Sequence, residues 1–192
     1  PNFRVATTEE EAVQFANEVG LPVVVKIVSP KALHKSDVGG VKVGLKTEDE
    51  IRETFQAFSQ FEAFSGMLIE EMVKGVELII GAKIDNQFGP VVLLGIGGTS
   101  VEIYQDTAIR MAPLKEADTK SMVESLTAKE LLRGYRGADP IDENRLAENL
   151  IKFSELVMEL GDQIESIDLN PVMCTKDRCV IADARIILGN PT

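Results

Sequence analysis

Helix-start signals alternate with apolar runs along this chain of 192 residues. Glu11 follows Thr8 by three positions, and Glu50 follows Thr47 by the same spacing. At this spacing the hydroxyl and the carboxylate reciprocally satisfy free amides of a first helical turn. Helices are therefore expected over 8–20, from 47 onward, over roughly 116–132 in two pieces, and over about 143–160.

The segments between these helices are rich in β-branched residues and read as buried strands. They are "PVVVKIVS", "GMLIEEMV", "VELIIGAKID" and "PVVLLGIGG", and the later stretch "SIDLNPVMCTKDRCVIADARI" predicts a hairpin. Strands and helices mix throughout, so the fold class is α+β. The length suits one substantial domain or two small lobes.

The formal charge of −11 makes nucleic acid and anionic membranes poor partners. No apolar run is long enough for a membrane span, and the N-terminus lacks the zones of a signal peptide. A cytoplasmic protein is expected. Cys174 and Cys179 are too few for a disulfide framework, so we expect reduced thiols.

Lys26 lies inside the apolar strand "VVVKIVS", where an ammonium is costly to bury without an anion. It either snorkels from a sheet edge or contacts a phosphate. Two glycine clusters could bring main-chain amides to an oxyanion. One is Gly39 and Gly40, and the other, with Gly97 and Gly98, leaves the strand "PVVLL". Neither has Walker or Rossmann spacing, and most such clusters mark turns only.

The hairpin is the strongest signal in the residues themselves. If Thr175 to Arg178 form the turn, the cross-strand pairs are Cys174 with Cys179, Asn170 with Asp183, and Asp168 with Arg185. This register segregates one face that carries Asp168, Asn170, Val172 and Cys174 from an apolar face. Asn170 and Asp183 could offer oxygen ligands to a hard cation such as Mg²⁺. The alternative is a solvated polar face with an Asp168–Arg185 ion pair.

Two further residues allow opposite readings. Glu77 follows a strand break at Lys74 and Gly75 and could accept hydrogen bonds from ribose hydroxyls, although an isolated strand carboxylate is more often simply exposed. His34 is the single histidine, and a single histidine is more often structural than catalytic.

Several separated motifs, in this order, resemble the ATP-grasp portion of NDP-forming acyl-CoA synthetases, the ADP-forming acetyl-CoA synthetases related to succinyl-CoA synthetase β. They are "VVVKIVSPKALHKSDVGGVKVGLKT", "ELIIGAKIDNQFGPVVLLGIGG", "LLRGYRG" and "IDLNPV" with "VIADARI". The resemblance covers almost all of the chain. It implies an ATP-grasp fold of two α+β lobes, 1–72 and 73–192, with the nucleotide between them. The family's N-terminal segment before "PNFRVATTEEEA" is expected to be missing.

The resemblance also implies roles, position by position. Lys26 matches the lysine on the nucleotide phosphates, and Glu77 matches the ribose carboxylate. Asn170 and Asp183 match the metal-binding pair. The adenine-binding hinge, where backbone groups read the base, matches Glu70, Glu71 and Val73.

His34 matches a histidine that carries a phosphoryl group from a CoA-binding subunit to ADP, and a neutral imidazole suits that chemistry. Glu102 and Arg110 fall in family motifs near the phosphates. The resemblance thus implies an enzyme, an acid–thiol ligase that uses ATP or ADP and Mg²⁺ with a CoA-binding subunit or fused domain. The alternative is a regulatory ATP-grasp module of a protein acyltransferase, fused to an acetyltransferase domain.

Overall fold

The helix-start signals are used as predicted in the computed structural model. Thr8 caps α1 (Glu9–Val19) by accepting a 3.2 Å hydrogen bond from the Glu11 amide, and Gly20 ends the helix. Thr47 and Glu50 form both bonds of a capping box at α2 (Glu48–Ser59). The third region is α4 (Glu116–Ser125) with the short 3₁₀ helix η1 (Lys129–Leu131), and the fourth is α5 (Glu143–Leu160).

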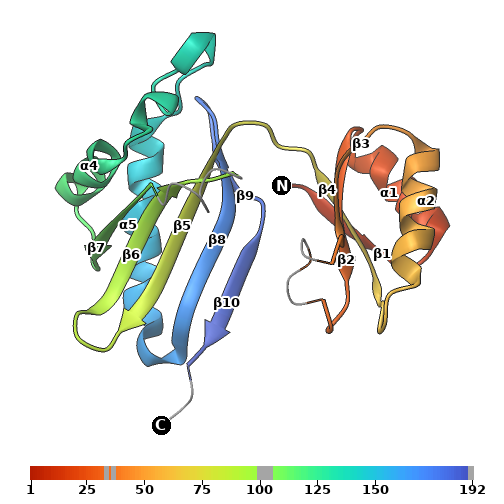
Figure 1. Ribbon diagram of the computed structural model, residues 1–192, viewed down its shortest axis with the longest axis horizontal. Helices are drawn as coiled ribbons and strands as arrows, with labels where there is room; N and C mark the ends of the chain where they lie inside the picture. The colour runs from red at the N-terminus through yellow and green to blue at the C-terminus, as the bar shows by residue number, and fades with distance from the viewer. Residues whose placement is uncertain (33–34, 36–37, 99–105, 190–192) are drawn as a thin grey trace. The chain divides into compact units, whose positions relative to one another are not determined.

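The structure describes residues 1–32, 35, 38–98 and 106–189. The chain divides into two units, which we call unit 1 (Pro1–Val73) and unit 2 (Lys74–Thr192). The sequence analysis expected the boundary after residue 72, which is one residue before the boundary between the two units. Each unit has one antiparallel sheet with helices on one face (Figure 1).

Unit 1 has the strand order β1-β4-β2-β3. The strands are β1 (Phe3–Ala6), β2 (Val23–Val28), β3 (Val41–Leu45) and β4 (Gly66–Glu71). Alternate residues of β2 and β4 pack against α1 and α2, whose Ile51, Phe55 and Phe58 complete the core as predicted. The short edge strands β1 and β3 were not predicted.

Unit 2 has the strand order β10-β8-β5-β6-β7, and β9 pairs with β8 off this path. The strands are β5 (Val76–Asp85), β6 (Gly89–Ile96), β7 (Thr107–Met111), β8 (Ile164–Cys174), β9 (Cys179–Ile181) and β10 (Ala184–Leu188). α4 and α5 cover one face of this sheet and share its core (Figure 1). The side chains that alternate with these core residues along the strands point to the other face of the sheet.

The hairpin has the predicted cross-strand register. The pairs are Cys174 with Cys179, Asp168 with Arg185, and Asn170 with Asp183, whose carbonyl accepts a 3.2 Å hydrogen bond from the Asn170 amide. The turn at Thr175 to Arg178 is closed by a 2.8 Å backbone hydrogen bond from the Thr175 amide to the Arg178 carbonyl.

β8 contains a bulge that the sequence analysis did not foresee. Leu78 of β5 pairs with Val172, whereas Ile80 pairs with Leu169, so two residues of β8 oppose one residue of β5. Pro171 lies in this bulge and has no amide to give to the ladder, which is why prolines inside sheets occur at such irregularities.

The bulge overturns the predicted division of the hairpin faces. Val172 and Cys174 were expected beside Asp168 and Asn170, but the extra residue reverses the alternation beyond Pro171. Val172 and Cys174 are therefore buried in the unit 2 core, while Asp168 and Asn170 are exposed. The polar face ends at the bulge.

Membrane insertion by a helix finds no support in the part of the chain that the structure describes. None of the helices there is both long enough and apolar enough to cross a bilayer.

Candidate functional site

Lys26 occupies the middle of β2, between Val25 and Ile27, which point into the unit 1 core. Because side chains alternate along a strand, Lys26 leaves from the opposite face, and there Glu70 of β4 meets it. The Nζ atom lies 2.7 Å from Oε2, with the two side chains only 7% and 10% exposed. The carboxylate offsets the desolvation of the ammonium. Sequence reasoning named Glu70 as a hinge residue but missed this pairing.

The end of β4 is tied to the start of the chain. The Glu71 amide donates a 2.9 Å hydrogen bond to the Asn2 carbonyl, and the Glu71 carboxylate accepts bonds from both nitrogens of Asn2 at 3.2 Å. Val73, the last predicted hinge residue, is also the last residue of unit 1. The predicted hinge thus coincides with the passage from one unit to the other.

The first glycine cluster has a packing role in the structure. The Gly40 amide donates a 2.7 Å hydrogen bond to the Lys35 carbonyl, and a Cβ at Gly40 would lie 2.4 Å from the Ile27 side chain. Gly39 adopts a φ of 68°, which favours glycine. Close packing and the turn therefore explain both glycines. His34, which the sequence places next to them, lies outside the described residues.

The second glycine cluster packs against Glu77, which is exposed. The Gly97 amide donates a 2.6 Å hydrogen bond to the Glu77 carbonyl, and a Cβ at Gly97 would lie 2.9 Å from that backbone. Gly98 has a φ of 90°, and its Cβ would lie 3.2 Å from Glu77 Oε2. The structure thus brings three predicted residues together. Glu102, further along the same motif, lies outside the described residues.

Glu77 and both glycines line a cavity of about 480 Å³ in unit 2. Its other walls are Val76, Ile96, Leu131, Tyr135 and Ala138. Tyr135 belongs to the motif "LLRGYRG", to which the sequence analysis gave no role. The position of an aromatic residue between Gly134 and Gly137 was the sequence signal that could have drawn attention to it, and the structure leaves it half-exposed.

A set of exposed ion pairs anchors this motif to α4 and α5. Arg133 pairs with Glu124 of α4 and, at 3.2 Å, with Glu143 of α5, while Lys129 meets Glu124 at 2.8 Å. These hydrogen bonds, from Lys129 first and then from Arg133, lower the pKa of Glu124 to about 2. The charge network therefore fixes the segment that carries Tyr135.

The opposite face of the unit 2 sheet gathers oxygen ligands at the hairpin. Asn170 lies opposite Asp183, and Asp168 is on the same strand two residues earlier. The Asp168 carboxyl is partly desolvated although the residue is exposed, and this raises its pKa; Arg185 opposes the rise and Asp183 adds to it. Two carboxylates that repel each other beside an amide oxygen suit a hard divalent cation. Sequence reasoning had placed Asp168 only in an ion pair.

The donor set fits Mg²⁺ as a partial site. In the described part of the chain, no three His, Cys, Asp or Glu side chains converge on one point. Mg²⁺ commonly takes one or two carboxylates from the protein and completes its octahedron with phosphates and water. The residues present therefore fit a cation that arrives with a phosphorylated ligand.

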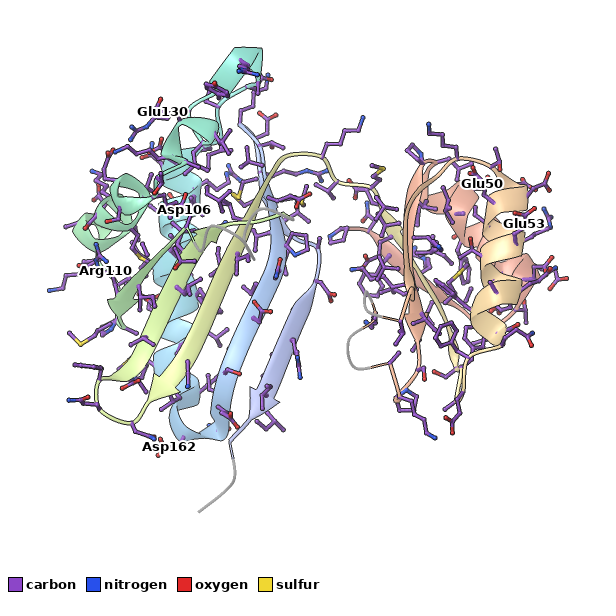
Figure 2. The ribbon with its side chains drawn as sticks, viewed as in Figure 1. Glu50, Glu53, Asp106, Arg110, Glu130 and Asp162 are labelled. Carbon is purple, nitrogen blue, oxygen red and sulfur yellow. A yellow bond between two sulfur atoms is a disulfide. The ribbon has the colours of Figure 1, made fainter. Side chains whose placement is uncertain are left out.

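Arg110 does not join this group. It lies on β7 opposite Val92, a core residue, so its side chain leaves from the helix-covered face of the sheet. Its guanidinium donates to the hydroxyls of Ser121 at 2.6 Å and Ser125 at 3.3 Å, both on α4. Figure 2 shows Arg110 on the strand beside α4. The structure therefore places Arg110 as an anchor for α4, on the other face from Asn170 and Asp168.

The two cysteines correct a further expectation. Cys174 and Cys179 are joined by a disulfide rather than present as reduced thiols. The composition argument considered only how many cysteines there are. The hairpin register makes these two direct neighbours.

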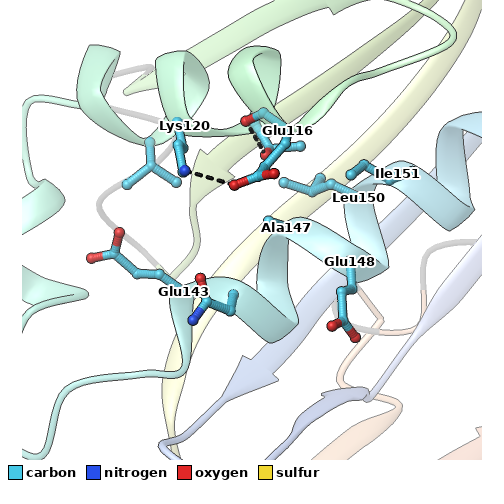
Figure 3. Close-up of a pocket in the computed structure, with 10 residues that line it drawn as sticks. Glu116, Lys120, Glu143, Ala147, Glu148, Leu150 and Ile151 are labelled. Atoms are coloured by element: carbon cyan, nitrogen blue, oxygen red, sulfur yellow. Dashed lines mark hydrogen bonds and ion pairs between the residues drawn. The ribbon is translucent and has the colours of Figure 1, made fainter.

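A second cavity, of about 460 Å³, lies between α4 and α5 (Figure 3). Its apolar lining includes Val123, Leu150 and Ile151. Its charged lining residues are three glutamates and Lys120, which pairs with Glu116 at 2.6 Å. This lining is unsuited to a phosphate. None of the predicted site residues lines it.

The fold and these groups define an ATP-grasp protein. The family model described as "ATP-grasp domain" matches residues 1–188, and the chain belongs to this family together with the β subunits of ADP-forming acetate–CoA ligases. The β subunit of acetate–CoA ligase I from Pyrococcus furiosus is 42% identical over 98% of this chain and 84% of its own length. The ADP-forming 4-hydroxybutyrate–CoA ligase of Nitrosopumilus maritimus is 40% identical over 97% of this chain, which spans 28% of that longer protein.

Solved structures agree with this membership. A dinucleotide-forming acetyl-coenzyme A synthetase 1 from Ca. Korarchaeum cryptofilum, in complex with coenzyme A, Ca-AMPCP and HgCl⁺, matches with a TM-score of 0.88. It is 44% identical, over 97% of this chain and 85% of that one. A second structure of that synthetase holds coenzyme A and Mg-AMPPCP, with its phosphohistidine segment pointing towards the nucleotide binding site. It matches with a TM-score of 0.82 and is 44% identical, over 97% of this chain and 84% of that one.

Proposed function

We propose that this chain is the nucleotide-binding and phosphotransfer part of a cytoplasmic ADP-forming acyl-CoA synthetase. The full reaction would convert acyl-CoA, ADP and phosphate reversibly into the acid, CoA and ATP, with a CoA-binding subunit or fused domain as partner. The observation that carries the proposal is the hairpin, where Asn170 and Asp183 oppose each other in a chain closely similar to the β subunits of such ligases.

Unit 1 supplies the cation for the nucleotide phosphates in this proposal. Lys26 is held by Glu70, so its ammonium keeps one position. A fixed charge needs little reorganisation when negative charge shifts between phosphoryl oxygens. The backbone groups at Glu70, Glu71 and Val73 are assigned to the base.

Unit 2 supplies the remaining contacts. Glu77 is assigned to the ribose hydroxyls, and Gly97 and Gly98 keep the space beside its carboxylate free of side chains. Asn170 and Asp183 would hold Mg²⁺, which when bound neutralises part of the phosphate charge.

His34 is assigned as the phosphoryl carrier. In the direction of ATP synthesis its imidazole nitrogen attacks the phosphorus of the partner's phosphohistidine, so one N–P bond forms as the other breaks. A terminal oxygen of ADP then attacks this phosphorus, and the P–N bond to His34 breaks as ATP forms. Glu102 is assigned near the phosphates, and we assign Arg110 to anchoring α4 on the evidence of its serine contacts.

The test is the half-reaction with Mg·ATP. Intact mass would be measured on the wild-type chain and on His34→Asn after incubation, before and after acid treatment, with nucleotide binding followed by titration calorimetry. We expect one acid-labile phosphate on the wild type, none on the variant, and similar nucleotide affinity for both.

Two other results would count against the proposal at different points. Nucleotide binding by the wild type without any phosphate would contradict the carrier role of His34. Loss of both binding and phosphate in a folded wild-type chain would contradict the nucleotide site itself.

A further inference from the structure

Cys174 and Cys179 form the ladder pair next to the hairpin turn. The backbone bond between Thr175 and Arg178 closes the turn, so the cysteines occupy the adjacent non-hydrogen-bonded pair, where facing side chains approach most closely. Their Cα atoms are 4.1 Å apart. The thiols of a reduced chain would therefore face each other directly across the ladder.

The two sulfur-bearing residues differ in access. Cys174 is fully buried in the unit 2 core, whereas Cys179 is only partly buried at the start of β9. Reaction of a thiol or disulfide with an external reagent depends on access to the attacked sulfur. An external reagent therefore meets Cys179, and Cys174 reacts from inside.

We propose that this pair is a thiol–disulfide exchange site for low-molecular-weight thiols and disulfides of the glutathione type. In oxidation, the Cys179 thiolate attacks one sulfur of the external disulfide, whose S–S bond breaks to release one external thiolate. The Cys174 thiolate then attacks the Cys179 sulfur, the mixed disulfide breaks, and a second external thiolate leaves. The two protons lost by the cysteines go to the two released thiolates, and reduction runs the same steps backwards.

The disulfide also restrains the hairpin. β9 has three residues, and only Ala182 separates it from Asp183. Cys174 is held in place by the neighbouring strand. The Gly75 backbone packs so closely against it that a Cβ on Gly75 would lie 2.5 Å from the Cys174 carbonyl oxygen. The oxidised pair therefore fastens β9 to a rigid strand, and the reduced pair leaves β9 to its backbone bonds. The value of this restraint for a cation at Asp183 rests on the proposed function, but the exchange chemistry does not.

The first test uses the full chain, reduced and then treated with oxidised glutathione, with intact mass followed over time. We expect Cys174→Ser to accumulate one glutathione adduct at least about tenfold faster than Cys179→Ser, because only the former keeps the accessible sulfur. The wild type should lose two hydrogens and carry no lasting adduct. Equal adduct rates in the two variants, or a wild type that ends with two adducts, would overturn the proposal.

Cys174→Ala repeats the measurement without a hydroxyl in the core, in case the serine variant does not fold.

Hydrogen exchange of the peptide over 176–183, without nucleotide, tests the restraint. We expect exchange at least about threefold faster in the reduced wild type than in the oxidised one, because opening then breaks only backbone bonds. Identical exchange would refute the restraint, whatever the outcome of the nucleotide experiments.

Discussion

The two sheets treat their charged residues in opposite ways. On the β2–β4 surface of unit 1, Lys26 and Glu70 are buried and matched in charge. On the hairpin of unit 2, Asp168 and Asp183 are of like charge and stand with Asn170 on a more open surface. The first arrangement is neutralised within the protein, whereas the second is the one that we propose is completed by a cation.

From this difference we expect the buried pair to be needed for folding and the hairpin residues to be needed for binding. Removing one member of a buried pair leaves an uncompensated charge, so it damages the fold. Removing one member of a like-charged pair relieves repulsion, and under the proposed function it weakens the binding of a cation. The predictions below test this separation, beginning with the largest expected effect.

Lys26→Met should lower the free energy of unfolding of unit 1 by about 3–5 kcal/mol, because Glu70 is left buried without its partner. Urea unfolding followed by circular dichroism measures the loss. Adding Glu70→Gln to this variant should restore much of it. Lys42→Met, an exposed lysine on β3, is the matched control, and a Lys26 variant as stable as this control would erase the contrast between the sheets.

Asp183→Asn should weaken Mg²⁺-dependent ADP binding by about 10–100-fold while changing the free energy of unfolding by less than about 1 kcal/mol. The asparagine keeps the oxygen that accepts the 3.0 Å hydrogen bond from the Ala184 amide, so the strand geometry is preserved. Titration calorimetry with and without Mg²⁺ measures the effect. Asp177→Asn makes the same charge change in the exposed turn and is the control. Equal losses of ADP affinity in the two variants would contradict a metal-binding role for Asp183.

Glu124→Gln sharpens the comparison with a third kind of charge, paired but exposed. Because hydrogen bonds from Lys129 and Arg133 lower its folded pKa to about 2 from 4.5, Glu124 stabilises the fold above pH 4.5. That contribution disappears as the pH falls from 4.5 towards 2. As the pH is lowered through this window, the melting temperature of the variant should therefore fall less steeply than that of the wild type. Glu155→Gln, an exposed change on α5, should keep the wild-type slope.

Asp168→Asn should give the smallest effect and the opposite sign. The folded pKa of Asp168 is raised above 3.8 by burial, so the folded chain binds this proton more tightly than the unfolded chain does. Stability from this group is present at low pH and is lost as the pH rises through the folded pKa. At neutral pH the variant should be more stable, by less than about 1 kcal/mol. A drop in its melting temperature at pH 7 would show that Arg185 outweighs burial and Asp183.

Much of the fold could be predicted because its signals are local. The hydroxyls of Thr8 and Thr47 cap the helices that follow them, and Gly161 ends α5. β1 and β3 were missed because they are short edge strands whose side chains do not alternate clearly between buried and exposed.

The site was predictable only in part, for a similar reason. The pairs along the hairpin follow from the turn alone, and they were predicted with the observed register. The partner of Lys26 lies on β4, distant in sequence, so the ion pair depends on which strands become neighbours. The reversal of Val172 and Cys174 required knowledge of how β8 pairs with β5, and nothing in the hairpin itself reports that pairing.

The bulge at Pro171 has a consequence for how this sequence can vary in length. One extra residue there turns Asn170 outward and Val172 inward on the same strand. An insertion or deletion between Asp168 and Cys174 would exchange exposed polar positions for core positions. Length changes among descendants of this chain should instead collect in the turn over 175–178, where added residues alter neither alternation.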